Sequence, residues 1–211
     1  MKINDSILIS DFEQAVSRYC GSKYGVAVSS QTNAVFLCLM LLKHKGILKD
    51  KDVITLPSRT YVSIPMSVLN AGLKTNLVDK EWSGAYRLEP TNIYDSAVRF
   101  TKDMYIKDSL YCVSFQYRKA LPLGRGGMVL TDSKEDYELL KKLRFNGRTD
   151  GIPQNEDIYT IQGWNMYMMP EQAARGLTLL SILINDNKDD GTDIAGSKDY
   201  PDLSKQEIFN E

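Results

Sequence analysis

Short, continuously apolar segments alternate with amphipathic helical segments along most of this chain. Segments that are apolar throughout, rather than at every second residue, are typical of strands buried on both faces. Strands that alternate with helices usually join into one sheet that is covered by helices on both sides. The sequence therefore predicts an α/β fold with a three-layer, mostly parallel sheet. Its expected strands span residues 25–29, 52–56, 74–79, 92–95, 110–115 and 128–131.

Several of the expected helices have recognisable ends. Ser10 and Glu13 have the spacing of a capping box, which predicts a helix beginning at Ser10 and ending near Gly21. The polar turn 29–33 opens a helix over about 32–45 that is apolar nearly all round, so we expect it to be buried. Further helices are expected over 64–69, from Ser133 to about Arg144, and from Pro170 onward.

Composition excludes several classes of function. The chain has 211 residues, 43% hydrophobic and 25% charged, which suits one domain with a substantial core. With a net charge of -1 and no basic run interleaved with aromatic residues, neither a nucleic-acid nor a membrane partner is expected. Cys20, Cys38 and Cys112 lie far apart in apolar segments, so we expect reduced, buried thiols in a cytoplasmic protein. His44 is the only histidine, so no zinc or other metal site is predicted.

The last part of the chain differs from the rest in charge. Residues 185–211 contain eight acidic and three basic side chains, a net charge of -5. We therefore divide the chain into a large domain, residues 1–184, and an extended acidic arm, residues 185–211, that packs on a neighbouring subunit.

Lys119 and Asp95 are the residues most suggestive of chemistry. Lys119 lies on a loop just after the strand expected over 110–115, an arrangement that holds an amine ready for imine formation. Asp95 ends another expected strand. On the same edge of a parallel sheet, the two side chains could hold opposite ends of a pyridoxal ring. Taken singly, each residue is equally well explained as a solvated lysine or a capping aspartate.

The turn 29–33 is a second candidate site. A strand that ends in small polar residues and opens a buried helix places backbone N–H groups at a positive helix end, where phosphate binds. An ordinary helix cap by Ser30 or Thr32 is the simpler explanation. An unrelated nucleotide-binding α/β domain would use the same turn, although the chain has no glycine-rich dinucleotide or Walker-type loop.

Taken in order, these segments resemble the DegT/DnrJ/EryC1/StrS family, pyridoxal-phosphate-dependent sugar aminotransferases of fold type I. The resemblance covers most of residues 12–180 and is specific as an ordered set. It rests on FEQAVSRYCGSKYGVAVSSQTNAVFLCLMLL, DVITLPSRTYVSIPMSVLNAGLKTNLVD, IYDSA, SFQYRKALPLGRGGMVLTD and GWNMYMMPEQAARG.

The resemblance implies a role for each of seven residues. Lys119 forms the Schiff base with pyridoxal 5'-phosphate and moves protons, and Asp95 keeps the pyridine nitrogen protonated. Tyr61 is implied to stack on the ring. Gln31 and Thr32 are implied to give backbone or hydroxyl contacts to the phosphate, with Ser114 beside them, and Asn165 to contact the phosphate of the neighbouring subunit. The last contact implies a homodimer with its active sites at the subunit interface.

The chain also departs from the family's pattern. Gln31 replaces a glycine, Arg125 an acidic residue and Tyr167 an arginine. One βα unit is missing near residues 80–92, and the family's C-terminal domain has no counterpart after Leu183, so the resemblance implies a minimised large domain.

Two functions follow from the resemblance. The first is an aminotransferase that uses an amino donor such as glutamate and, as acceptor, a keto sugar that is expected to be nucleotide-linked. The alternative is a non-catalytic protein of the same fold with an assembly or regulatory role.

Overall fold

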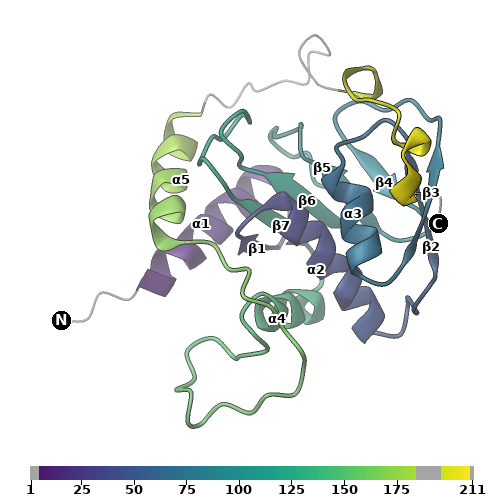
Figure 1. Ribbon diagram of the computed structural model, residues 1–211. Helices are drawn as coiled ribbons and strands as arrows, with labels where there is room; N and C mark the ends of the chain where they lie inside the picture. Colours follow the sequence, from purple (N-terminus) through teal and green to yellow (C-terminus); the bar gives the residue numbers. More distant parts are fainter. Residues whose placement is uncertain (1–4, 184–195, 210–211) are drawn as a thin grey trace.

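Residues 5–183 and 196–209 are described in a computed structural model (Figure 1). The α-helices are α1 (Asp5–Cys20), α2 (Gln31–His44), α3 (Ser63–Asn70), α4 (Lys134–Leu143) and α5 (Pro170–Ile182). The strands are β1 (Tyr24–Val28), β2 (Val53–Pro57), β3 (Lys74–Val78), β4 (Tyr86–Leu88), β5 (Ile93–Ser96), β6 (Leu110–Ser114) and β7 (Gly127–Thr131). Three short 3-10 helices follow: η1 (Ser197–Asp199), η2 (Leu203–Lys205) and η3 (Glu207–Phe209).

The α/β class predicted from the sequence is confirmed, but the sheet is mixed rather than mostly parallel. Its five strands have the order β1-β7-β6-β5-β4, and only β5 and β6 run parallel to one another within it. A parallel pair, β2 and β3, lies beside this sheet and joins it through a bridge between Thr55 and Glu89. Sequence patterns predict where strands lie, whereas the direction of a pair depends on the connection between its strands.

Connection length explains the antiparallel pairing of β4 with β5. Parallel neighbours need a crossover of a dozen or more residues, usually with a helix, whereas antiparallel neighbours need only a short turn. Residues 89–92 alone join β4 to β5, so these strands pair as a hairpin. Residues 79–92, all of them described, contain the strand β4 but no helix.

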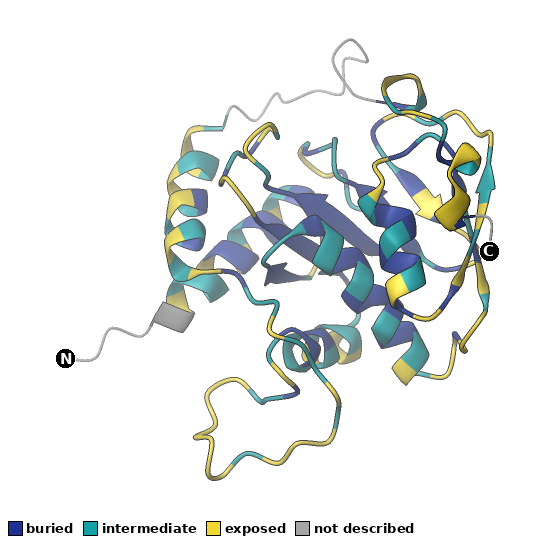
Figure 2. Cartoon of the chain, in the orientation of Figure 1, coloured by how far each residue is buried: buried dark blue, intermediate teal, exposed yellow. Residues whose placement is uncertain are grey.

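The helices form two layers around the sheet, and alternate strand residues face each layer. Val26, Val28 and Cys112 pack in a core with α2, α3 and α4. Ala27 and Val113 pack in a second core with α1 and α5. The strands β6 and β7 are buried along their whole length, as Figure 2 shows for the centre of the sheet. The predicted three-layer arrangement therefore holds.

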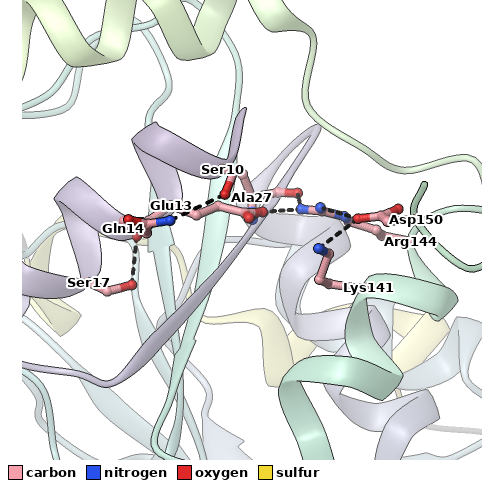
Figure 3. A network of polar contacts seen from close by, with 8 residues as sticks. All are labelled: Ser10, Glu13, Gln14, Ser17, Ala27, Lys141, Arg144 and Asp150. Atoms are coloured by element: carbon pink, nitrogen blue, oxygen red, sulfur yellow. Dashed lines mark hydrogen bonds and ion pairs between the residues drawn. The ribbon is translucent and has the colours of Figure 1, made fainter. Parts of the chain in front are cut away.

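The expected capping box at Ser10 is wrong, because α1 begins earlier, at Asp5. Glu13 instead lies in the buried interior, where its carboxylate accepts a hydrogen bond from the Ala27 backbone N–H at 2.8 Å and forms an ion pair with Arg144 (Figure 3). Arg144 also donates to the Ala27 carbonyl oxygen at 2.6 Å. This cluster ties α1 and β1 to the residue that caps the C-terminus of α4.

Residues 196–209, called here the C-terminal segment, lie against their own chain. Ser197 and Leu203 donate backbone hydrogen bonds to the carbonyl oxygens of Trp82 and Ser58, at 3.0 and 2.9 Å. Leu203 and Phe209 are buried, and Figure 1 shows the segment in yellow beside β3 and β4. The rest of the predicted arm, residues 185–195 and 210–211, lies outside the described residues.

The three cysteines are buried and free, as predicted. Within the described ranges, no helix combines the length and the apolar character needed to cross a membrane.

Candidate active site

A cavity of about 710 Å³ opens where β5 and β6 end and α2 begins. Its size falls within the range typical of small-molecule sites. Chain segments far apart in the sequence meet here, and its lining includes Ser30, Gln31, Thr32, Asn33, Tyr61, Ser63, Asp95, Ala97, Ser114, Gln116, Tyr117, Arg118, Lys119, Arg125, Gly126 and Tyr200.

Lys119 reaches the cavity from the loop between β6 and β7. That loop is held at its base, where Phe115 donates a backbone hydrogen bond to the Gly126 carbonyl at 3.0 Å. The Lys119 N–H donates to the Gln116 carbonyl at 2.9 Å, closing a turn that points the residue at the site. Partial burial lowers the pKa of the Lys119 amine, and the charge of Asp95 opposes this shift. A lowered pKa raises the fraction of neutral amine, which is the nucleophilic form.

Asp95 lies near the end of β5 and is only 4% exposed. Its Oδ1 accepts hydrogen bonds from Gln31 Nε2 at 2.8 Å and from the Ala97 backbone N–H at 2.9 Å. Burial raises the pKa of Asp95, while the hydrogen bonds from Ala97 and the Tyr86 hydroxyl, and the charge of Lys119, act in the opposite direction. Among the described residues no lysine or arginine forms an ion pair with it, so the carboxylate can accept a cation brought by a ligand.

The first turn of α2 forms one end of the cavity. Ser30 is the N-cap, and its hydroxyl accepts a hydrogen bond from the Asn33 N–H at 3.1 Å. The positive end of the helix and the hydroxyls of Thr32 and Ser114 make this end of the cavity suitable for an anion. Gly127 permits the close packing behind it, because a Cβ there would lie 2.5 Å from the Gln31 backbone nitrogen.

Tyr61 and Tyr200 are two of the three tyrosines that line the cavity. Tyr61 follows β2 and is 59% exposed, so its ring is available to a ligand. Tyr200 belongs to the C-terminal segment and is half-buried. The side chains of Arg118 and Arg125 add positive charge at the cavity. The cavity therefore combines an amine, a buried carboxylate, an anion-binding helix end and an accessible aromatic face.

Six of the seven residues predicted from the sequence line this one cavity: Gln31, Thr32, Tyr61, Asp95, Ser114 and Lys119. Asn165 is exposed and does not line it, and its backbone forms a bridge with Phe145. The side chain of Gln31 points to Asp95, so the phosphate contact expected of this residue falls to its backbone. Sequence reasoning missed Tyr86 and Tyr200, since no local pattern shows that either would reach the site.

The chain belongs to the DegT/DnrJ/EryC1/StrS aminotransferase family, whose model matches residues 6–104 and 106–189. Among curated relatives, GDP-perosamine synthase of Caulobacter vibrioides is 28% identical over 214 residues, covering 82% of this chain and 56% of that protein. The spore coat polysaccharide biosynthesis protein SpsC of Bacillus subtilis is 25% identical over 225 residues, covering 83% of this chain and 57% of that protein. The chain thus spans little more than half the length of these relatives.

Solved structures share the fold. AtS13 from Actinomadura melliaura superposes with a TM-score of 0.73 and 19% identity, over 83% of this chain and 60% of that one. A GDP-4-keto-6-deoxymannose-3-dehydratase, solved with a trapped PLP-glutamate geminal diamine, gives a TM-score of 0.71 and 20% identity, over 83% and 61% of the two chains. At this identity the likeness establishes the fold alone, which is that of fold type I enzymes.

Proposed function

We propose that this chain binds pyridoxal 5'-phosphate in the cavity and acts as an aminotransferase. The observation that carries the proposal is the convergence of Lys119, Asp95 and the N-terminus of α2 on one cavity of suitable size. Membership of an aminotransferase family supports it independently. We also propose that residues 1–184 form the large domain that binds the cofactor and that residues 185–211 form an acidic arm.

The residues present fit this cofactor. The N-terminus of α2, Thr32 and Ser114 would hold its phosphate, and the ring nitrogen would supply the cation that buried Asp95 lacks. Tyr61 would cover a face of the ring. When bound, the cofactor supplies an electrophilic carbonyl carbon and a ring that draws electrons away from the substrate carbon.

The chain's own residues would do the remaining work. Lys119, whose pKa is lowered by burial, would supply the amine for the cofactor's carbonyl carbon and would carry a proton to and from the substrate carbon. The negative charge of Asp95 would hold a proton on the ring nitrogen. The loop that carries Lys119 positions the amine through the Gln116 and Gly126 hydrogen bonds.

The proposed substrates are an amino acid such as glutamate, as donor, and a nucleotide-linked keto sugar, as acceptor. Arg118 and Arg125 at the cavity suit the carboxylate or diphosphate groups of such molecules. GDP-perosamine synthase, one of the relatives, is named for a nucleotide-linked amino sugar. We further propose a homodimer in which Asn165 reaches the partner's phosphate, and a cytoplasmic location, which suits three free, buried cysteines.

The test is titration of the purified chain with pyridoxal 5'-phosphate, followed by borohydride reduction and mass spectrometry of the modified peptide. We expect one label per chain on Lys119, and none in Lys119→Ala. Lys102→Ala, which removes an exposed lysine outside the cavity, should label as the wild type does.

Glutamate is then added to the loaded protein, and release of 2-oxoglutarate is measured. Release supports the aminotransferase. Labelling of Lys119 without release of 2-oxoglutarate favours the non-catalytic alternative. If the chain takes up no cofactor, the proposal is wrong, and nucleotide binding at the turn 29–33 becomes the better explanation.

A further inference from the structure

The C-terminal segment is fastened to the chain at two places. At its start, a backbone bridge joins Gly196 to Ser83, and a Cβ at Gly196 would lie 2.5 Å from the Trp82 carbonyl oxygen. Further along, Asp202 forms a bridge with Arg59. Tyr200 therefore lies between two attachment points, so its position is set from both sides.

The residues that receive this segment lead directly into the cavity. Arg59 donates to the Tyr200 carbonyl oxygen at 3.4 Å, and the Arg59 carbonyl accepts from the Trp82 indole N–H at 2.8 Å. The Trp82 and Tyr200 rings stack, with centroids 5.8 Å apart and planes inclined by 23°. Tyr61 is two residues beyond Arg59, so the segment that places Tyr200 also supports the backbone that places Tyr61.

The negative charges of the segment do not occupy the cavity. Asp199 accepts a hydrogen bond from the Gly196 N–H at 2.8 Å, and Asp202 accepts from the Ser204 hydroxyl at 2.6 Å. Both carboxylates thus cap turns within the segment, and neither they nor Glu207, the third acidic residue of the segment, line the cavity. The residue that the segment presents there is a neutral aromatic side chain, Tyr200.

We propose that the C-terminal segment forms a wall of the cofactor cavity and that Tyr200 contacts the aromatic ring of the ligand, as a binding residue paired with Tyr61. The inference rests on the proposed function and adds a contact from outside the part of the chain where the other site residues lie. Aromatic contact favours a flat heteroaromatic ring over an aliphatic ligand, while the phosphate end of the site is formed by α2.

The experiment compares Tyr200→Ala and Tyr200→Phe in the full chain. Trp164→Phe is introduced throughout, so that Trp82, next to Tyr200, is the remaining tryptophan and its fluorescence reports ligand binding. The dissociation constant of pyridoxal 5'-phosphate should rise about tenfold in Tyr200→Ala and less than about threefold in Tyr200→Phe, which keeps the ring. The inhibition constant of inorganic phosphate, measured by competition, should stay unchanged in both variants.

Tyr137→Ala is the matched control, because Tyr137 is also half-buried and stacked on another ring, that of Tyr24, but lies on α4 outside the cavity. It should leave both constants unchanged. If the Trp164→Phe protein, the parent of the other variants, binds pyridoxal 5'-phosphate with the same affinity as its Tyr200→Ala variant, the inference is overturned and the proposed function stands. An equal loss of affinity for phosphate and for pyridoxal 5'-phosphate also overturns the inference, because the substitution then weakens the whole site rather than the contact with the ring. Failure of the parent to bind pyridoxal 5'-phosphate overturns the proposed function and this inference together.

Discussion

Titration of Asp95 should change the free energy of unfolding of the protein. Because burial raises its pKa above the ordinary value of 3.8, its proton is bound more tightly in the folded than in the unfolded chain. The stability that this provides is complete below the unfolded pKa and is lost as the pH rises through the folded pKa. The cofactor-free protein therefore loses stability on ionisation of Asp95.

We expect Asp95→Asn to remove this loss. Without cofactor, the free energy of unfolding of the variant should rise relative to the wild type as the pH is raised from about 4 towards neutrality. Urea unfolding of both proteins at a series of pH values measures the difference in their free energies of unfolding. The contributions of the other titrating groups cancel in this difference. A wild type that instead gains stability over the variant with rising pH would show that Asp95 is a stabilised carboxylate in the empty cavity.

Gln31 is the departure from the family pattern with a direct structural consequence. Its amide donates to Asp95, so it already stabilises the negative charge that the cofactor ring would neutralise. Gln31→Ala should lower the free energy of unfolding of the cofactor-free protein by about 1–3 kcal/mol at neutral pH. It should also increase the rise in melting temperature caused by pyridoxal 5'-phosphate, because the unpaired carboxylate then gains more from the ligand.

Thermal unfolding with and without the ligand measures both effects. Gln14→Ala serves as control, since Gln14 is an exposed amide whose hydrogen bond goes to Ser10 rather than to the site. A ligand-induced shift that is the same in wild type and Gln31→Ala contradicts competition between the amide and the ligand.

At the scale of elements, the Glu13–Arg144 pair links α1, β1 and the end of α4. Both side chains are almost fully buried, at 4% and 6% exposed, so removing one partner leaves a buried charge that has lost its main compensation. Without Glu13, Arg144 retains the longer ion pair with Asp150, at 3.6 Å. Glu13→Gln and Arg144→Met should each lower the free energy of unfolding by about 3–5 kcal/mol, and the double variant should cost less than the sum.

Denaturant unfolding of the three variants completes the cycle. The exposed pair Lys134–Glu138, at 74% and 60% exposed, provides the comparison, and Lys134→Met should change stability by about 0–1 kcal/mol. Strict additivity of the Glu13 and Arg144 effects would show that the two charges do not stabilise one another.

The elements with strong local patterns could be predicted from the sequence. The buried strands β6 and β7, helix α2 and the Pro170 start of α5 lie where apolar runs and caps predicted them. The strand β4 is not predicted because three residues are too few to show an alternating pattern of apolar and polar side chains. Its extended conformation is defined by pairing with β5. Ser10 and Glu13 suggested a helix start because they have the right spacing, but the burial of Glu13 is decided by Arg144, far away in sequence.

The site shows the same division between local and distant information. The placement of Lys119 and Asp95 follows from strand ends, which sequence patterns locate well. That the Gln31 side chain turns to Asp95, and that Tyr200 returns to the cavity, depends on contacts between segments distant in the chain. Such contacts leave no pattern in a single sequence.

At the scale of the whole molecule, the exposed position of Asn165 permits a test of the proposed homodimer. If Asn165 serves the partner's site, a mixed dimer of Lys119→Ala and Asn165→Ala subunits contains one intact site, which combines Lys119 of one subunit with Asn165 of the other. Differently tagged subunits, purified as mixed dimers, should bind about one pyridoxal 5'-phosphate per dimer at wild-type affinity.

Equilibrium titration and reductive labelling of the mixed dimers measure this directly. The Asn165→Ala homodimer, in which both sites lack the amide, is the control and should bind more weakly. Mixed dimers that bind as weakly as this control would place Asn165 in the site of its own subunit, and a monomeric wild type would rule out the shared site altogether.

Tyr200 enters the cavity from a part of the chain that the ribosome makes long after Lys119 and Asp95. A growing chain can fold the earlier sheet and helices first, as domains generally do during synthesis. For that interval the amine and the carboxylate face an opening with no aromatic ring on that side. The order of translation therefore allows the sheet edge to form before the cavity wall that covers it is complete.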